Sequence, residues 1–573
     1  MRSIQKAVGT LLLLLLTYSC NRKDPDPDPD IKVEADITLD ELVDMEVYGE
    51  GMIVDCRYLS GNRTNRILVN NTLNTEPVTL DLTGVGYYGL EIFTSNSTEE
   101  IPHVIRMVVL DPVRGEAEWG LPVWIPRGVT VEPIENQDIL TIYPREIPQG
   151  FSFPLVAVVE GQLTQSIDNL EASVGSASFL IKRGSGSVWV SPDDQSSNQL
   201  VIDHRTFPIH ISEMSDPPLS LSGVLGEYTS IPANSYVNVA ADLTIPEDIT
   251  LTIGSGTFVT LNPGVNIYNE GTLLIEGLED SPITFTCTDQ EAYWGGVIGK
   301  AAGNRVDASH AIFGRSGHHK GGEYDWGHAH RQALFYSEYG TISLDHCYMI
   351  DHIGQIFYPV SASMELDYCL VQRAMTGGQL NNSQVSINHS IFTDFPDDSY
   401  TYRDQDNDAL YLMECVAVIS NSVFMYAKDD GLDSGGGAGG EVIVTNTRFE
   451  SIFHEGAALS GGWDSPKSQN FHNCIFADCG QGLELGYSSP NHLVTVESSL
   501  FHRNGIGIRY GDNYEFPNNG FITVSNSQSI ENETYDIWNM DREDWVADTA
   551  HMEFNNVWVT KANPMYPKLN IFK

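Results

Sequence analysis

The chain has 573 residues, and its 77 Asp and Glu against 31 Lys and Arg give a formal net charge of −46. A polyanion of this size repels phosphate, so we expect no nucleic acid among its partners; the charge suits an extracellular protein or one that binds neutral sugars or cations. Hydrophobic residues make up 41% of the chain, which is enough for packed cores and excludes a largely disordered protein.

The first 20 residues are typical of an export signal. Arg2 and Lys6 precede the apolar run Leu11–Leu16, which is too short to remain in a bilayer as a spanning helix. The run leads to Cys20, and a cysteine in this place resembles the lipobox of bacterial lipoproteins. The resemblance implies that residues 1–20 are a lipoprotein signal peptide and that a lipid on Cys20 anchors the protein to the outer membrane.

Residues 21–36 are predicted to be an acidic tether. Between Asp24 and Asp30 every second residue is proline, and such a stretch stays extended because it cannot form a core. An acidic stretch directly after a lipidated cysteine resembles the surface-export signal of Bacteroidota lipoproteins. The resemblance implies a protein exported to the cell surface.

Two modules of short alternating strands are predicted next, over 37–111 and 112–215. Gly86–Ile92 resembles the tyrosine corner of immunoglobulin-like sandwiches, and the lengths fit one β-sandwich each. We expect both modules to be spacers without chemistry of their own.

From Leu219 to the C-terminus, short strands alternate with Gly and Pro, which resembles the opening coils of secreted right-handed β-helices. A six-residue pattern with a polar turn residue then recurs, mostly at steps of about 21 to 28 residues, which is the length of one β-helical coil. The aligned segments are Leu344–Met349, Leu366–Val371, Ile387–Phe392, Ile419–Phe424, Val444–Phe449, Phe471–Phe476, Val496–Phe501 and Val524–Ser527. The chain is therefore predicted to be all-β, with a right-handed parallel β-helix over 219–573 after the two immunoglobulin-like modules.

The same alignment predicts two structural columns inside the coils. Asparagines at the turn tolerate left-handed backbone angles and can stack as a hydrogen-bonded ladder. Cys347, Cys369 and Cys474 share a column with Ser390, so they are predicted to be packed thiols. No CxxC pair occurs, which argues against a zinc knuckle or a redox motif.

A second column in the repeat is acidic. Its first position is occupied coil by coil by Asp408, Asp430, Glu455, Gln481 and Ile506, and its fourth by Tyr411, Asp433, Ala458, Glu484 and Arg509. Asp429 and His454 directly precede two of the acids. Neighbouring coils lie about 4.8 Å apart. Carboxylates at that spacing repel, so we expect a raised pKa, a shared proton or a bound cation.

Such a column suits carbohydrate chemistry. Retaining glycosidases use two carboxylates about 5 to 5.5 Å apart and inverting ones about 6.5 to 9.5 Å. One coil separates Asp408 from Asp430, and two coils, roughly 9.6 Å, separate Asp408 from Glu455. Side-chain direction decides the actual spacing.

The block also resembles the active site of β-helical polygalacturonase-like enzymes, glycoside hydrolase family 28. Their N-T-D, D-D, G-H-G and R-I-K motifs correspond to Asp406–Asp408, Asp429–Asp430, Phe453–Gly456 and Ile508–Tyr510, with Glu455 and Tyr510 as departures. The resemblance implies an inverting hydrolase in which Asp430 or Asp429 is the general acid. Asp408 and the other member of the pair would then activate water. His454 would tune the acid and Arg509 would bind substrate.

The full candidate set follows from the column and its neighbours. The catalytic candidates are Asp408, Asp429, Asp430, His454 and Glu455. The candidates for binding a polysaccharide or oligosaccharide are Lys428, Asp433, Trp463, Arg509 and Tyr510. No cofactor is required by this chemistry. Exposed aromatic rings suit stacking on sugars, and Tyr487 and Tyr514 are further candidates for this role. Equally, some of these rings could belong to the core.

Two other functions fit the same residues. A polysaccharide lyase would hold Ca²⁺ at Asp408, Asp430 and Glu455 and would use Lys428 as base and Arg509 as acid. Alternatively, Lys428 neutralises the acids, and Glu484 pairs with Arg509 across one coil. The remaining option is a glycan-binding or adhesin protein without catalysis.

A histidine-rich insertion over 316–331 is the last feature. His318, His319, Trp326, His328 and His330 all lie in it. His328 and His330 would share one face of a strand, which predicts either a transition-metal site, a substrate contact or plain loop histidines.

Overall fold

The computed structural model describes part of the N-terminal third and most of the remainder. Described in the N-terminal part are 35–42, 46–49, 52–69, 72–74, 79–82, 86–95, 100–110, 140–143, 146–148, 153–159, 170–182, 185–190, 199–202, 205–208 and 210–212. Described in the rest are 218–319, 321–396, 406–437, 439–511, 518–530, 532–539, 551–555, 557–559 and 570–571. Cys20, the tether up to residue 34 and Tyr514 lie outside these ranges. Within these ranges, no helix has the length and apolar character needed to cross a membrane.

The first group of N-terminal strands forms two small sheets. The larger has the order β2-β9-β8-β5-β4, with β6 on β5, and the smaller has the order β1-β3-β7. Their bounds are β1 (Ile37–Thr38), β2 (Glu46–Gly49), β3 (Ile53–Asp55), β4 (Tyr58–Leu59), β5 (Asn62–Val69), β6 (Thr72–Asn74), β7 (Thr79–Asp81), β8 (Gly86–Ser95) and β9 (Glu100–Leu110). A single turn of 3-10 helix, Leu39–Glu41, follows β1.

The second group forms three small sheets, β10-β12-β15, β11-β18 and β14-β13-β16-β17. The bounds are β10 (Leu140–Tyr143), β11 (Glu146–Pro148), β12 (Phe153–Val159), β13 (Leu170–Val174), β14 (Ala177–Ile181), β15 (Ser185–Val190), β16 (Gln199–Ile202), β17 (Arg205–Pro208) and β18 (His210–Ser212). The all-β character of both groups is confirmed. Their immunoglobulin-like topology and the boundaries 37–111 and 112–215 stay predictions, and the side chains of the expected tyrosine corner lie outside the description.

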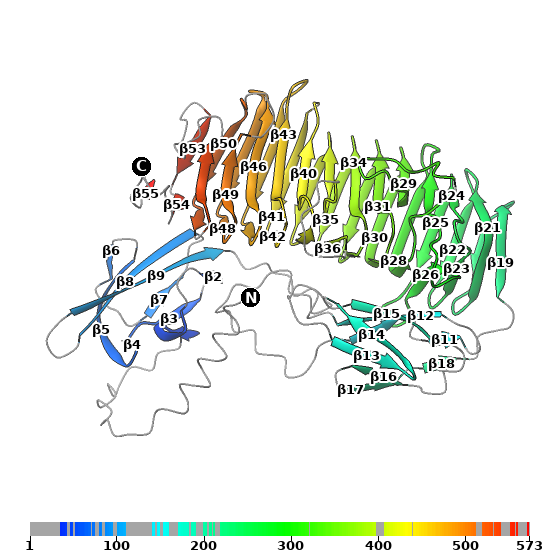
Figure 1. The fold of residues 1–573 in the computed structure, drawn as a ribbon, viewed down its shortest axis with the longest axis horizontal. Helices are drawn as coiled ribbons and strands as arrows, with labels where there is room; N and C mark the ends of the chain where they lie inside the picture. The colour runs from blue at the N-terminus through cyan, green and yellow to red at the C-terminus, as the bar shows by residue number, and fades with distance from the viewer. Residues whose placement is uncertain are drawn as a thin grey trace.

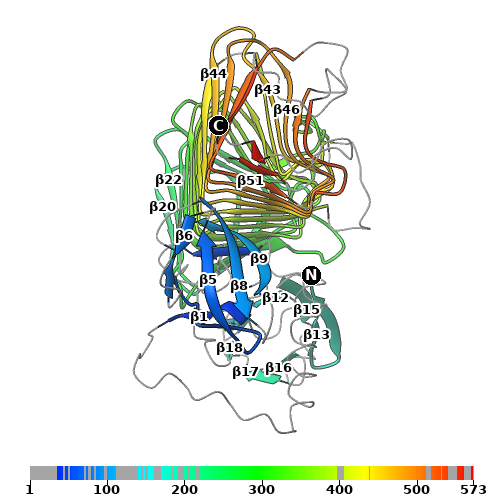
Figure 2. The ribbon, with the colours of Figure 1, turned by 90° about the vertical axis from the view of Figure 1, so that its left-hand side faces the viewer.

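A parallel β-helix follows, and it contains one continuous sheet of 37 strands from β19 to β55. Figure 1 shows the coils stacked along the long axis of the molecule, and Figure 2 shows them nearly end on. The right-handed β-helix that the repeat predicted is confirmed. The first strands are β19 (Leu219–Val224), β20 (Thr229–Ile231), β21 (Tyr236–Ile245), β22 (Thr250–Gly254), β23 (Phe258–Leu261), β25 (Thr272–Glu276), β26 (Ile283–Cys287), β28 (Arg305–Gly314) and β30 (Thr341–Ile350).

Each later coil contributes one strand to each of three faces. The repeat face contains β32 (Ser363–Asp367), β35 (Gln384–Asn388), β38 (Val416–Ser420), β41 (Gly440–Thr445), β44 (Lys467–His472), β47 (His492–Glu497), β50 (Phe521–Ser525) and β53 (Met552–Asn555). The middle face contains β33 (Leu370–Gln372), β36 (Ile391–Phe395), β39 (Val423–Ala427), β42 (Arg448–Glu450), β45 (Ile475–Ala477), β48 (Leu500–His502), β51 (Gln528–Ile530) and β54 (Val557–Val559). The short β55 (Asn570–Ile571) pairs antiparallel with β54.

The third face, here called the site face, carries the acidic column. Its strands are β24 (Ile267–Asn269), β27 (Val297–Gly299), β29 (Ala333–Glu338), β31 (Gln355–Val360), β34 (Thr376–Asn381), β37 (Tyr411–Met413), β40 (Leu432–Gly435), β43 (Glu455–Gly461), β46 (Gln481–Ser488), β49 (Ile506–Tyr510) and β52 (Tyr535–Asn539). Each of these strands pairs in parallel with the next one along the face.

The alignment of the repeats matches the observed register. On the repeat face, Leu344 lies opposite Leu366 and Leu366 opposite Ile387. The series continues through Ile419, Val444, Phe471, Val496 and Val524. These apolar residues line the core of the helix because alternate side chains of a strand point inward.

Inside the coils the same position is filled repeatedly by the same kind of side chain. Phe424, Phe449 and Phe476 stack with ring centroids 5.3 and 4.9 Å apart. The three cysteines predicted to be packed thiols are at most 1% exposed, and all are free, which confirms the prediction. Stacking identical side chains lets each coil bury the inner surface of its neighbour.

The asparagine ladder is also confirmed. Asn421, Asn446 and Asn473 have φ angles of 51°, 50° and 55°, in the left-handed region that asparagine tolerates. The Asn446 side chain donates to Asn421 Oδ1 at 3.1 Å, and that of Asn473 donates to Asn446 Oδ1 at 2.7 Å. The ladder therefore satisfies polar groups at a corner that turns in every coil.

Candidate active site

The acidic residues lie at the corner where each coil enters the site face. Gly431 and Gly456 follow two of them, and a Cβ on either glycine would lie 2.6 Å from the carbonyl oxygen of the next coil's glycine. Glycine is needed here because the backbones of successive corners pack too closely for a side chain. The close packing brings the preceding side chains of successive coils near one another.

A ladder of hydrogen bonds fixes the carboxyl groups in the corner. The amide of Asp430 donates to Asp408 Oδ1 at 3.1 Å, and the amide of Glu455 donates to Asp430 Oδ1 at 3.0 Å. The Gln481 side chain then donates to Glu455 Oε1 at 2.5 Å. Each carboxyl group thus accepts a hydrogen bond from the residue at the same position in the next coil. The geometry is set by the β-helical register and does not depend on flexible loops.

Burial and mutual repulsion raise the pKa of two carboxyls in this cluster. Asp408 and Glu455 are 4% and 2% exposed. Burial raises the pKa of both carboxyls well above the usual range, and the nearby charge of Asp430 raises them further. The hydrogen bond from His454 lowers the pKa of Glu455 without cancelling the effect of burial. A raised pKa is one of the three outcomes that the sequence left open for the acidic column.

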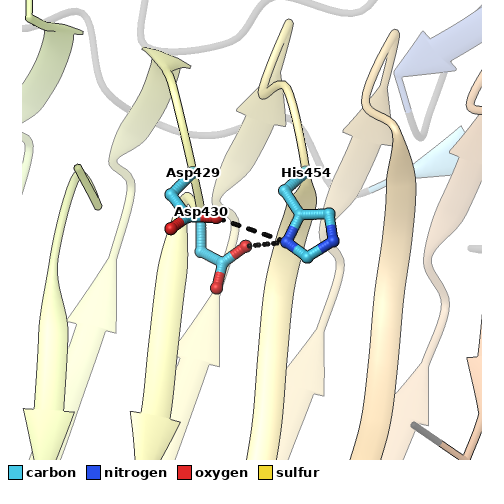
Figure 3. A group of neighbouring side chains, drawn as sticks. All are labelled: Asp429, Asp430 and His454. Carbon is cyan, nitrogen blue, oxygen red and sulfur yellow. Dashed lines mark ion pairs between the residues drawn. The ribbon is translucent and has the colours of Figure 1, made fainter. Parts of the chain in front are cut away.

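His454 joins the neighbouring acids into one group, as Figure 3 shows. Its Nδ1 lies 3.3 Å from Asp429 Oδ1 and 3.5 Å from Asp430 Oδ1, and it also contacts Glu455 Oε2. Burial alone would lower the pKa of His454, but these three carboxyls raise it far above its usual value. A protonated imidazole in turn favours ionised carboxylates beside it.

The same group could hold a metal ion. In the described part of the chain, the one set of three His, Cys, Asp or Glu ligand atoms all within 4.8 Å of one another belongs to Asp429, Asp430 and His454. The set differs from the predicted calcium ligands, because His454 and Asp429 take the places of Asp408 and Glu455. Oxygen ligands suit Ca²⁺, but a histidine can ligate only when its ring is neutral.

The fourth position of the repeat forms an outward column on the site face. In register, Tyr411 lies opposite Asp433, Asp433 opposite Ala458, Ala458 opposite Glu484 and Glu484 opposite Arg509. This order matches the sequence alignment. Burial and the charge of Asp430 also raise the pKa of Asp433 well above the usual range.

Arg509 and Glu484 form an ion pair across one coil. Arg509 Nη1 lies 3.0 Å from Glu484 Oε2, and both side chains are 8% exposed. The pairing that the sequence offered as an alternative to an acid role for Arg509 is present. An arginine held in this way presents its remaining N–H groups in a fixed orientation.

Of the other predicted binding residues, Trp463 is exposed, whereas Lys428 and Tyr510 are buried. Trp463 is 39% exposed, and its ring lies 4.6 Å from that of Tyr487. Lys428 is 3% exposed, with its ammonium 5.4 Å from the centre of the Phe453 ring. Tyr510 belongs to the core: it is 2% exposed, and its hydroxyl donates to Gly520 O at 2.9 Å. The prediction that Tyr510 stacks on a sugar was therefore wrong, because its position in the strand points inward.

The histidine-rich insertion does not form the predicted strand. His328 and His330 lie in consecutive turns, and the described residues of the insertion contain no three ligand atoms close enough to bind a metal. Instead, His328 Nδ1 lies 3.2 Å from Asp406 Oδ1, and its ring is 4.7 Å from that of Tyr411. The hydrogen bond with Asp406 raises the pKa of His328, although burial opposes the shift. No pattern in the sequence predicted that this loop contacts Asp406 and Tyr411.

A buried lysine was also missed. Lys467 is 2% exposed, and its ammonium donates to the carbonyls of Ser434, Gly435 and Ser460 at 3.1, 2.7 and 3.0 Å. Burial lowers its pKa to about 8, although the charge of Asp433 acts in the opposite direction. Its place on an alternating strand was the one available signal, because lysine at an inward position is unusual.

Comparisons with known proteins give distant structural likenesses. No family model and no curated protein matches the chain. The fold is similar to the periplasmic alginate epimerase AlgG, with 11% identity and a TM-score of 0.39 over 58% of this chain and 78% of that one. A catalytic-domain variant of a GH87 α-1,3-glucanase in complex with nigerose has 10% identity and a TM-score of 0.38 over 74% and 90%.

A third similar structure is the A-module of mannuronan C-5 epimerase AlgE4 from Azotobacter vinelandii. It has 12% identity and a TM-score of 0.18 over 60% of this chain and 90% of that one. All three neighbours are carbohydrate-active enzymes. Likenesses this distant carry no weight for substrate or mechanism, so both are inferred from the described residues alone.

Proposed function

We propose that the protein is a glycoside hydrolase whose active centre comprises Asp408, Asp429, Asp430, His454 and Glu455. The observation that carries the proposal is the unequal surroundings of these carboxyls. Burial and repulsion raise the pKa of Asp408 and Glu455 well above the usual range, whereas Asp429 and Asp430 lie 3.3 and 3.5 Å from the imidazole of His454, which also contacts Glu455. Acid and base catalysis requires this division, because one carboxyl must give a proton and another must take one.

The residues support a direct displacement by water. Asp408 gives its proton to the glycosidic oxygen as the bond between that oxygen and the anomeric carbon breaks. The Asp429–Asp430 pair removes a proton from a water molecule, whose oxygen bonds to the anomeric carbon. This assignment exchanges the roles that the family resemblance implied, because the raised pKa belongs to Asp408.

Inversion is the proposed stereochemical outcome. Inverting enzymes leave room for water between carboxyls about 6.5 to 9.5 Å apart. The corners of Asp408 and Asp430 are one coil, roughly 4.8 Å, apart, so inversion requires their carboxyl groups to point away from each other around the water. Arg509, Asp433 and Trp463 are the proposed contacts to the sugar, and Lys428 is proposed to balance the charge of the acids.

A second candidate is a calcium-dependent lyase acting on a uronate polymer. The observation that favours it is the set of ligand atoms from Asp429, Asp430 and His454 within 4.8 Å of one another. A cation there would neutralise a uronate carboxylate. The buried position of Lys428 over Phe453 gives less support to its role as base.

A panel of neutral and acidic polysaccharides tests these functions together. New reducing ends without the absorbance of unsaturated uronate are expected. Unsaturated products that disappear with a chelator would replace the hydrolase by the lyase. Binding without any product would leave a glycan-binding or adhesin protein.

We also propose that the protein is exported and anchored to the outer membrane through a lipid on Cys20. Support comes from the signal-like N-terminus and the acidic tether. Replacing Cys20 with Ala should move the protein from the membrane fraction to the soluble fraction. Retention of the Cys20→Ala variant on the membrane would contradict lipid anchoring.

A further inference from the structure

The outward column extends well beyond the acids. Toward the N-terminus, Tyr411 lies opposite Gln379, and the strand of Gln379 pairs with that of Tyr358. The column continues from Tyr358 through Tyr336, Ile298 and Tyr268, each opposite the one before it. Toward the C-terminus, Arg509 lies opposite Trp538. One line of side chains therefore runs along the site face, with tyrosines at one end and charged residues at the other.

The insertion 316–331 covers the tyrosine end. The Trp326 ring lies 4.3 Å from that of Tyr336 and 6.1 Å from that of Tyr358, and Tyr324 lies 6.1 Å from Tyr268. The ammonium of Lys300 lies 4.7 Å from the centre of the Tyr324 ring. Tyr336 is 6% exposed as a result. These rings pack over the strands, so a sugar chain on this half would meet the rings of the insertion and not the column beneath them.

Specific hydrogen bonds fix the edge of the insertion next to the acids. The Gln355 side chain donates to Trp326 O at 3.0 Å, and the amide of His328 donates to Gln379 Oε1 at 2.9 Å. Gly327 has a φ of 73°, and a Cβ there would lie 2.9 Å from both Gln379 and Tyr358. His328 then closes the edge through its contacts with Tyr411 and Asp406.

The covered half ends in the coil of Asp408, the first of the acids. Tyr411 is the last covered position, and its partner Asp433 is the first of the charged half. Asp433, Ala458 and, at the far end, Trp538 are partly exposed, whereas Glu484 and Arg509 between them are buried in their ion pair. The Trp538 ring stacks on Tyr535 at 4.2 Å. Four coil steps, roughly 19 Å, separate Asp433 from Trp538, which leaves length for several sugar units on one side of the acids.

From this arrangement we infer that the protein acts from a chain end. The inference rests on the proposed hydrolase. The edge formed by Trp326 and His328 stops the terminal sugar beside the acids, and the rest of the polymer extends over Ala458 toward Trp538. The reaction is the hydrolysis described above, applied to the first bond from the stopped end. His328 is thereby a residue that determines specificity, and its imidazole faces the terminal sugar.

The test compares oligosaccharides with free ends and the same oligosaccharides with both terminal residues chemically capped. Chains of neutral α- and β-glucans, galactan, polygalacturonate and alginate serve as probes, with products sized by chromatography and binding measured by calorimetry. A single short product from free-ended chains, with capped chains at least tenfold slower, is the expected result. Cleavage of capped chains at equal rate into mixed lengths would overturn the inference and leave the hydrolase intact.

The remaining outcomes are also decisive. Binding without cleavage would overturn the hydrolase. In that case, tenfold weaker binding of capped chains would still support a site that holds a chain end. Equal binding of capped and free chains would overturn that site as well. Neither binding nor cleavage across the panel would overturn both.

Two variants locate the effect in the insertion. The double variant Trp326→Ala, His328→Ala removes the edge and should release products of mixed length from capped chains. His330→Asn changes a nearby exposed histidine and should keep the single short product; asparagine tolerates the positive φ of 46° at this position. Thermal unfolding of both variants reports whether the insertion still packs. Should the double variant not fold, the capped and free chains still decide the matter with the unaltered protein.

Discussion

The two halves of the outward column share one backbone register but differ in what their side chains can do. From Tyr268 to Tyr411 the column is mostly aromatic, and rings from the insertion cover it. From Asp433 to Arg509 three of the four positions carry ionisable side chains, and the fourth is Ala458. The β-helix therefore supplies identical geometry along its length. The proposed function is confined to the coils where the corner residue is acidic, and the cover of the insertion ends at the first of them.

The strongest test of the acidic half is Asp430→Asn. The amide keeps an acceptor for the Glu455 N–H but loses the charge that contacts His454. Loss of an acid or base group slows catalysis by about 100-fold to 10,000-fold. We expect a fall in kcat of this size at unchanged thermal stability, measured by release of reducing ends.

Glu441→Gln is the matched control for this change. Glu441 is exposed on β41 of the repeat face, so its replacement should leave kcat unaltered. Equal activity of Asp430→Asn and the unaltered protein would place the active centre elsewhere.

A substitution in the aromatic half is expected to lower the free energy of unfolding. Tyr336→Ala removes a nearly buried ring between Trp326 and Tyr358. Truncating a buried aromatic residue costs about 3 to 5 kcal/mol in the free energy of unfolding. Urea denaturation followed by tryptophan fluorescence measures this change. A loss below about 1 kcal/mol would mean that the insertion does not pack on the column.

A smaller effect is expected on the pH dependence of stability, and it arises from Asp408 in the acidic corner. In the folded protein the pKa of Asp408 lies well above its unfolded value, so folding favours the protonated carboxyl. Its contribution to stability is complete below about pH 4 and is lost as pH rises through the raised pKa.

Asp408→Asn removes this dependence and keeps the acceptor for the Asp430 N–H. We expect the variant to match the unaltered protein near pH 4 and to be more stable by about 1 kcal/mol at pH 8. Thermal unfolding across this pH range gives the difference. A gain that shrinks as pH rises would contradict the raised pKa.

Much of this fold was predictable because a β-helix repeats its chemistry. Leu366, Asn446 and Cys369 occupy positions that recur at every coil, so aligning the repeats gave the register of the core, the ladder and the acids together. The order of the outward column followed in the same way, down to the pair of Glu484 and Arg509.

The errors concern side-chain direction and loops, which a repeat does not encode. Tyr510 follows Arg509 directly, and in a strand adjacent residues point to opposite faces, so it lies in the core. His328 is about 80 residues from Asp408 in the chain, and it lies beside Asp406 and Tyr411 because Gly327 and Gln379 fix the insertion on the sheet. Lys467 was missed because its partners are backbone carbonyls, and every residue has one, so no particular residue type marks the site.

The stereochemistry of the first product tests the proposed centre most directly. Proton NMR during the first turnovers of a cleaved oligosaccharide identifies the anomer before mutarotation. Displacement by water between acids on different coils predicts the inverted anomer. A retained anomer or an unsaturated uronate product would contradict it.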